Sequence, residues 1–134
     1  MKSSKVSDIQ IINIPKIKDR RGNLSVIEKD VIPFEIKRVY YLYDVPSGAY
    51  RGGHAHKDQL EFLIAISGSF DVVMQDAFGD KTKVTLNKPN KGLLIPNMIW
   101  RELEDFSSSA VCLVVASDVY DEDDYLRNFK KFVK

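Results

Sequence analysis

The stretch from Gly48 to Glu61 (Gly-Ala-Tyr-Arg-Gly-Gly-His-Ala-His-Lys-Asp-Gln-Leu-Glu) decides where the chemistry of this chain lies. It holds His54 and His56, the only two histidines in the sequence. Residues two apart on a strand point to the same face of the sheet, so we expect both imidazoles to reach one pocket. An isolated pair of this kind is more often a solvated surface feature. Here the neighbouring glycines permit tight bends and the close approach of a ligand, and the apolar run that follows predicts a buried strand, so the pattern favours a site.

On both sides of this stretch, the sequence pattern predicts many short strands. They cover residues 9–14, 24–28, 36–44, 60–67, 70–75, 83–86, 92–96, 99–103 and 110–116. Short strands separated by turn signals indicate a sandwich, a jelly roll or a small barrel.

The tail has a different period. Its apolar residues Tyr125, Phe129 and Val133 recur every four positions, which predicts an amphipathic helix. Acidic residues stand at the start of this segment and lysines at its end, as the helix dipole favours. We therefore interpret the acidic run of residues 121–124 as a solvated first turn.

Composition limits the class of protein. The 134 residues predict one domain, 1–134, with a core of its own. Lys and Arg number 20 against 19 Asp and Glu, so no nucleic-acid or membrane partner is expected. The longest apolar run, residues 111–116, is too short to span a bilayer, and the first residues show no secretory signal. Cys112 lies in that run and is interpreted as a small buried hydrophobe. We expect a cytoplasmic protein without disulfides.

Two motifs resemble those of the cupin superfamily. The first comprises Gly48, His54, His56, Glu61 and Gly68, and the second is residues 92–101, GLLIPNMIWR. Metal-binding cupins end the second motif with a histidine ligand, where this chain has Arg101. A guanidinium has no lone pair to offer and repels a divalent cation, so no metal is expected. His54, His56 and Glu61 could still form a 2-His-1-carboxylate set, which keeps a metal-dependent cupin enzyme as an alternative.

A closer resemblance covers residues 17 to 129. Residues 20–28 (RRGNLSVIE), 32–41 (IPFEIKRVYY), 51–57 (RGGHAHK) and 116–125 (ASDVYDEDDY) are similar, in this order, to the sugar 3,4-ketoisomerases. The resemblance implies an all-β cupin jelly-roll β-barrel, here with a short C-terminal α-helix. It implies a homodimer, often with exchanged strands, and no cofactor. It also implies an isomerase that moves the keto group of dTDP-4-keto-6-deoxy-D-glucose from C4 to C3, in the biosynthesis of dTDP-3-amino-3,6-dideoxyhexoses for bacterial surface polysaccharides or natural products.

The residues fit that chemistry. The proton on C3 must be removed to form an enediol intermediate, and C4 must then be protonated. These steps need a base with a pKa near neutrality and a second proton carrier. By the resemblance, His54 is the carbon base, and His56 and Tyr40 act at the sugar oxygens. Glu61 is interpreted as a partner for a histidine N–H or as a structural group. A nucleotide-sugar epimerase and a non-catalytic sugar-nucleotide sensor remain alternatives.

Cations are needed for the diphosphate. Arg38 shares a strand face with Tyr40, and Arg51 lies beside the histidines, so both are expected to bind phosphate oxygens. By the resemblance, Arg21 and Arg101 lie near the sugar. Arg21 is similar to the branch that forms a galacto product and Arg101 to the branch that forms a gluco product, so the configuration at C4 stays open.

Overall fold

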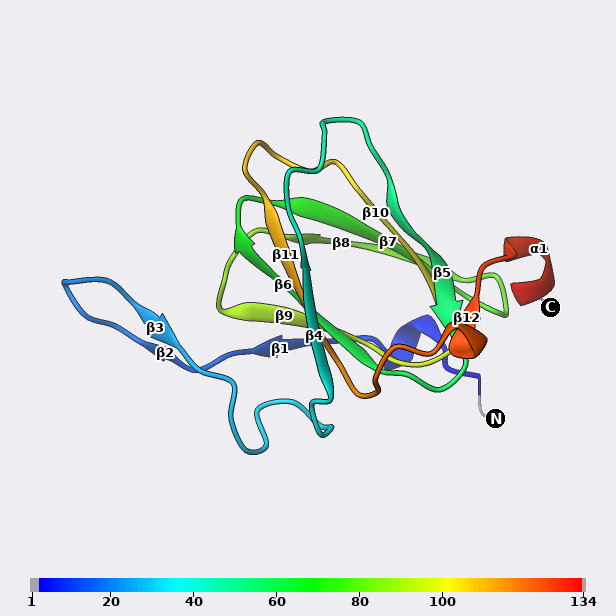
Figure 1. Cartoon of the computed structure of the whole chain (residues 1–134), viewed down its shortest axis with the longest axis horizontal. Helices are drawn as coiled ribbons and strands as arrows, with labels where there is room; N and C mark the ends of the chain where they lie inside the picture. Colours follow the sequence, from blue (N-terminus) through cyan, green and yellow to red (C-terminus); the bar gives the residue numbers. More distant parts are fainter. Residues whose placement is uncertain (1–2, 134) are drawn as a thin grey trace.

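The structure, a computed structural model, describes residues 3–133 and consists mainly of two antiparallel five-stranded sheets (Figure 1). In sheet order, the first contains β1 (Gln10–Asn13), β9 (Lys91–Ile95), β6 (Glu61–Ser67), β11 (Val111–Ala116) and β4 (Arg38–Leu42). The second contains β12 (Tyr125–Leu126), β5 (Arg51–His56), β10 (Ile99–Glu104), β7 (Phe70–Asp76) and β8 (Lys81–Leu86). The chain crosses repeatedly between the sheets, as in a jelly roll. The all-β jelly-roll prediction is confirmed, although the described strands form an open sandwich rather than a closed barrel.

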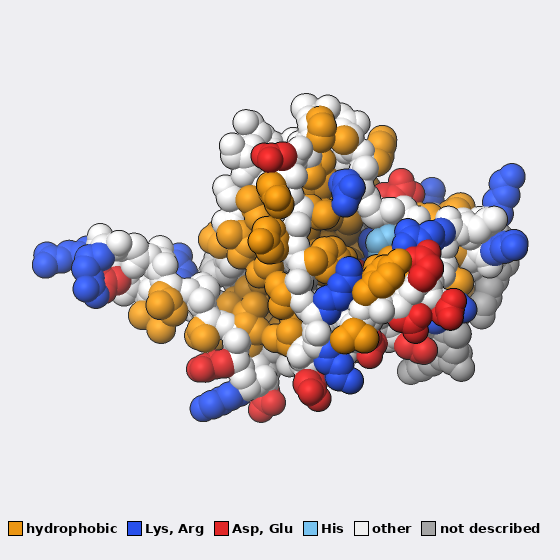
Figure 2. Space-filling view, viewed as in Figure 1, with side chains coloured by type: hydrophobic (Ala, Val, Ile, Leu, Met, Phe, Trp, Pro, Cys, Tyr) orange, Lys and Arg blue, Asp and Glu red, His pale blue; other side chains and the backbone are white. Residues whose placement is uncertain are grey.

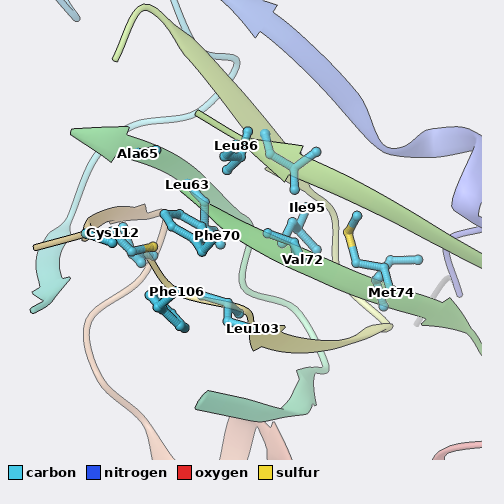
Figure 3. Close-up of a cluster of buried hydrophobic side chains, with 14 residues drawn as sticks. Leu63, Ala65, Phe70, Val72, Met74, Leu86, Ile95, Leu103, Phe106 and Cys112 are labelled. Carbon is cyan, nitrogen blue, oxygen red and sulfur yellow. The ribbon is translucent and has the colours of Figure 1, made fainter. Parts of the chain in front are cut away.

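The main core lies between the sheets (Figure 3). Alternate residues of the long strands β6 to β11 enter it, and they include Leu63, Phe70, Val72, Leu93, Ile95, Leu103 and Cys112. Burial raises the pKa of the Cys112 thiol, which agrees with its interpretation as a small hydrophobe. A second cluster, with Phe62 and Ile64, covers the outer face of the first sheet. Strand β6 is therefore buried on both faces, which explains its continuous apolar sequence.

At one end of the sandwich the inner faces become polar. Glu61 precedes Leu63 on the inner face of β6, and Arg101 precedes Leu103 on that of β10. Tyr40 on β4 packs against the same end of the core. The strands that build the apolar core therefore also carry the polar groups of the site.

The tail differs from the predicted helix. Residues Glu122–Asp124 form a 3-10 turn (η2), Tyr125 and Leu126 pair with β5 as strand β12, and only Phe129–Phe132 are α-helical (α1). The edge of β5 offers unpaired backbone groups that the tail satisfies, and the Asn128 side chain caps the helix start by accepting from the Lys131 N–H. A short C-terminal helix is thus present, but it begins at Phe129, five residues after the end of the acidic run 121–124. Of the described helices, none is long and apolar enough to cross a membrane.

A two-stranded hairpin projects from the sandwich (Figure 1). It consists of β2 (Lys16–Ile17) and β3 (Leu24–Ser25) and follows a short 3-10 turn, η1 (Val6–Asp8), and strand β1. Ile17 and Leu24 on this hairpin are more than half exposed. Strand β4 ends the first sheet and exposes Val39 and Tyr41, and Tyr43 just after the strand is exposed as well. Two exposed apolar surfaces of this kind are typical of an interface.

The contact between Gly92 and Phe62 gives a test of the packing. A Cβ at residue 92 would lie 1.9 Å from Phe62 Cζ, so Gly92→Ala is expected to lower the free energy of unfolding by about 1–3 kcal/mol or more. Urea unfolding measures this loss. Phe62→Leu should relieve part of the clash, so the double variant should be more stable than the sum of the two single losses predicts. Strict additivity would contradict the packing.

Candidate active site

A cavity of about 410 Å³ opens at the polar end of the sandwich. Its walls include side chains from β4, β5, β6 and β10, together with Tyr125 and Arg127 of the tail. In the space-filling view, the pale blue of a histidine lies in a hollow flanked by basic side chains (Figure 2). The cavity has both the polar groups that orient a ligand and apolar walls supplied by residues such as Leu63 and Val114.

An irregularity in β5 turns His54 toward this cavity. His54 lies opposite Arg101 on β10, whereas Glu102 lies opposite Gly52, so Gly53 is an extra residue in the ladder. Gly52 and Gly53 have φ angles of 89° and 73°, a region of backbone conformation that residues other than glycine rarely adopt. A Cβ on Gly52 would also lie 3.1 Å from the Arg101 carbonyl oxygen. The double glycine is therefore needed for this bulge.

His54 has the features of a general base. Its side chain lines the cavity and is 9% exposed, and its Nε2 has no hydrogen-bond partner among the described residues. The Gly52 backbone hydrogen-bonds the ring and favours its protonated form, against the effect of burial on the pKa. Burial, followed by the charge of Arg101, lowers the pKa of His54 to about 3, so the imidazole is neutral and can accept a proton, but it is a weaker base than the near-neutral one expected from the sequence.

Glu61 is the centre of a buried hydrogen-bond network behind the cavity wall. Its Oε1 accepts from Arg101 Nη1 at 2.6 Å, and its Oε2 accepts from the Tyr40 hydroxyl at 2.8 Å and from the Gln59 amide at 3.0 Å. Glu61 is 2% exposed and Arg101 is 1% exposed. The remaining described bonds of the Arg101 guanidinium go to the Ile99 carbonyl oxygen, from Nε and Nη2. Both buried charges are therefore paired and hydrogen-bonded.

Tyr40 and Arg38 form one wall of the cavity, as predicted from their strand face. The Tyr40 hydroxyl donates to Glu61, so its oxygen is free to accept a hydrogen bond from the cavity. Burial, reinforced by the Glu61 charge, raises the pKa of Tyr40. The Arg38 guanidinium lies 4.5 Å from the centre of the Tyr40 ring, a distance at which a cation is attracted to the aromatic face.

His56 lies deeper than His54. It is fully buried and is not among the described residues that line the cavity. Its ring packs edge-on against that of His54, with centroids 4.8 Å apart, and its Nδ1 lies 3.0 Å from Asp124 Oδ2. Burial, and then the charges of Arg101 and Arg38, lower the pKa of His56 to about 3. The two histidines share a face as expected, but only His54 reaches the cavity.

Four of the described arginines line the cavity, and the predicted Arg21 lies outside it. Arg38 and Arg51 line the cavity as predicted, and Arg101 forms its buried back wall. Arg127 also lines it but was not predicted; it stacks on Tyr125 at 4.2 Å and pairs with Glu122. The similarity of residues 116–125 to the ketoisomerases pointed to this region, but a helical interpretation placed it away from the site. Arg21 does not join the group: it lies on the projecting hairpin, bonded to Asp19, with its side chain 85% exposed.

His54, His56 and Glu61 have ligand atoms within 4.8 Å of one another, the arrangement that metal-dependent cupins use. The donors nevertheless do not fit a divalent cation. Both Glu61 oxygens accept protein hydrogen bonds, and the Arg101 guanidinium lies 2.6 Å from one of them. A cation here would face a buried positive charge at close range, so we derive no step through a metal.

A jelly-roll sandwich with an acid–base cavity at its polar end places this chain among the cupins. The profile of FdtA, described as WxcM-like, C-terminal, matches residues 7–134. The chain is 44% identical over 128 residues to the TDP-4-oxo-6-deoxy-alpha-D-glucose-3,4-oxoisomerase of Aneurinibacillus thermoaerophilus, covering 92% of this chain and 91% of the relative. This protein therefore belongs to the FdtA family of WxcM-like, C-terminal proteins.

Solved structures agree with this assignment. WlaRB, a TDP-quinovose 3,4-ketoisomerase from Campylobacter jejuni, superimposes with a TM-score of 0.90 at 43% identity, covering 96% of this chain and 98% of that one. QdtA, a sugar 3,4-ketoisomerase from Thermoanaerobacterium thermosaccharolyticum in complex with TDP, gives a TM-score of 0.92 at 38% identity, covering 96% and 93%.

The low histidine pKa values predict how stability depends on pH. Both values lie near 3 in the folded protein, below the ordinary 6.5, so the unfolded chain binds more protons between these limits. The contribution to stability is present above pH 6.5 and is lost as the pH falls toward 3. Urea unfolding of the wild type between about pH 8 and 5 should show this decline. A variant with both histidines replaced by Asn should lose less unfolding free energy over the same pH range. An equal loss in the variant and the wild type would contradict the lowered histidine pKa values.

Proposed function

We propose that this protein is a 3,4-ketoisomerase that acts on TDP-4-keto-6-deoxyglucose and forms the 3-keto isomer. The observation that carries the proposal is His54, a neutral imidazole that lines the same cavity as Tyr40 and whose buried Nε2 has no hydrogen-bond partner among the described residues. The named activities of the relatives support the substrate class. A nucleotide-linked sugar is an intracellular metabolite, and we accordingly propose a cytoplasmic enzyme.

The arginines provide a place for the diphosphate. Arg38, Arg51 and Arg127 line the cavity and come from β4, β5 and the tail. Guanidinium groups donate forked hydrogen bonds to phosphate oxygens, so three of them around one opening suit a nucleoside diphosphate. In the proposed complex the sugar points inward, toward His54 and Tyr40, and the nucleotide stays near the cavity mouth.

The proposed reaction needs no redox partner. His54 Nε2 takes the proton from C3, and the electron pair of the broken C–H bond forms the C3–C4 double bond while the carbonyl electrons move to O4. Tyr40 accepts the proton of the C3 hydroxyl and passes its own proton to O4. The electrons on O3 then form the new carbonyl group, and protonated His54 returns its proton to C4. Atoms and charges balance, and Glu61 holds the Tyr40 hydroxyl between turnovers.

Replacing His54 tests this mechanism. His54→Asn is expected to reduce turnover by about 10²–10⁴-fold, with little change in TDP affinity, because Asn keeps the polarity of the site but removes the base. The assay incubates the sugar nucleotide in deuterated water and follows the exchange of deuterium into the sugar and the position of the keto group by NMR. The same spectra give the configuration at C4. Wild-type exchange rates in His54→Asn would refute the assignment of the base.

The alternatives give different results in that assay. A product that keeps its ketone at C4 indicates an epimerase, and TDP binding without any exchange indicates a sensor. Activity that EDTA abolishes and a divalent metal restores would favour a metal-dependent cupin. Each of these results contradicts the proposed reaction.

We also propose that the active unit is a homodimer in which the β2–β3 hairpin of one subunit lies along β4 of the other. The hairpin exposes Ile17 and Leu24, and β4, whose outer edge has no strand partner among the described residues, exposes Val39 and Tyr41. Joining them would bury apolar surface and satisfy the open edge. The turn of the hairpin would then bring Arg21 toward the cavity of the second subunit, since β4 also carries Arg38 and Tyr40.

Mixed dimers test this exchange. Arg21→Ala and His54→Asn should each have low activity alone, because each homodimer has two defective sites. After the two variants are unfolded together and refolded, about half of the dimers are mixed, and one of their two sites has both Arg21 and His54 intact if Arg21 acts across the interface. Activity should then rise to about a quarter of the wild-type level. No recovery, with mixed dimers confirmed by mass spectrometry, would show that Arg21 does not act in trans.

A further inference from the structure

Asp124 is the residue through which the tail reaches the buried histidine. Its Oδ2 lies 3.0 Å from His56 Nδ1 and accepts from the Gln59 N–H at 3.3 Å, while its Oδ1 accepts from the Asp58 N–H at 2.8 Å. Its backbone oxygen accepts from the Lys57 N–H at 2.9 Å. One residue of η2 thus receives donors from four consecutive residues, 56 to 59. This is not the solvated helix turn that the acidic sequence predicts.

These contacts determine which nitrogen of His56 carries the proton. An ionised carboxylate only accepts hydrogen bonds, so His56 must donate Nδ1–H to Asp124 and present a lone pair at Nε2. The Gln59 amide nitrogen lies 3.5 Å from that Nε2 and donates to Glu61 at 3.0 Å. Both ring nitrogens of His56 therefore face protein groups, and neither faces the cavity.

The residue after Asp124 completes the arrangement. Tyr125 contacts both imidazoles, with its ring centroid 5.0 Å from that of His54 and 4.4 Å from that of His56. It also pairs with His56 in the β12–β5 ladder. The His54 ring is thus held between the edge of His56 and the ring of Tyr125, and both of these depend on where Asp124 docks.

We propose that Asp124 is a positioning residue for the ketoisomerase reaction: it fixes the tautomer and orientation of His56, and through His56 and Tyr125 it holds the His54 base toward the substrate. This inference rests on the proposed function for its kinetic consequence only. The tautomer of His56 is a property of the free enzyme. We therefore assign His56 a supporting role behind His54, in place of the proton transfer to the sugar oxygens that the sequence suggested.

Asp124→Asn is the direct test. The amide can still accept from the Asp58 N–H through its oxygen, but its NH₂ group then faces His56 Nδ1, which must become an acceptor. His56 is expected to change from the Nδ1–H to the Nε2–H tautomer, and nitrogen-15 chemical shifts of the labelled imidazoles distinguish the two. The sequence has only two histidines, so His56→Asn assigns the signals. The kcat should fall about tenfold or more, a part of the acid–base contribution, with KM nearly unchanged.

Asp123→Asn is the matched control. Asp123 is the exposed neighbour of Asp124 in the same 3-10 turn, so its replacement removes the same charge from the same segment. We expect it to keep the wild-type kcat and the wild-type tautomer. Asp124→Glu retains the carboxylate, and we expect it to keep the Nδ1–H tautomer and recover part of the activity. It also provides the test if the Asn variant does not fold.

A double-mutant cycle shows whether Asp124 acts through His56. If it does, Asp124→Asn should lower kcat much less in a His56→Asn background than in the wild type. Equal effects in both backgrounds, or a wild-type tautomer and kcat in Asp124→Asn, would overturn the proposal. Failure of the proposed function appears differently, as a wild-type protein that does not isomerise the sugar nucleotide while the tautomer still responds to Asp124.

Discussion

The buried ion pair between Arg101 and Glu61 is the interaction on which the site depends. Burying two charges costs several kcal/mol per ion, and the cost is recovered only where geometry and hydrogen bonding are good. Here the pair is 2.6 Å apart, and Tyr40, Gln59 and the Ile99 carbonyl oxygen complete its hydrogen bonds. It stands where the inner faces of β6 and β10 change from apolar to polar. Loss of either partner would leave an isolated charge beside the core.

The same pair controls the protonation of its neighbours. The positive charge of Arg101 follows burial as a cause of the low pKa of both His54 and His56, and the negative charge of Glu61 helps to keep Tyr40 protonated. A neutral base and a protonated phenol are the two forms that a keto–enol rearrangement needs. In metal-binding cupins a histidine ligand occupies the position of Arg101. In this protein the Arg101 guanidinium supplies the positive charge at that position. Unlike a metal ion, it is part of the chain and needs no ligands to hold it.

How much of this was readable from the sequence depends on the range of the interactions. Alternation along β4 correctly placed Arg38 and Tyr40 together, because neighbours on one strand are set by local geometry. The spacing of His54 and His56 gave their shared face but not their depth, which depends on the tail and on Gln59. The tail itself was misread: its four-residue period predicts a helix, but pairing with the edge of β5 outweighed that local preference. Asp124, Tyr125 and Arg127 were missed for this reason.

The site therefore combines parts of different rigidity. Glu61 and Arg101 lie on the inner strands β6 and β10, and His54 lies on the buried end of β5, where side chains have little freedom to move. Arg51 and Arg127 lie at the rim of the cavity and are exposed. Proton transfer needs the reacting atoms held to within a fraction of an ångström, whereas a flexible diphosphate can be bound by groups that adjust. In the proposed enzyme, the chemistry common to the family is accordingly carried by the core of the sandwich. The proposed diphosphate contacts of Arg51 and Arg127 lie at the rim, whereas the two positions expected to bear on the face of C4 are divided, with Arg101 in the core and Arg21 on the hairpin.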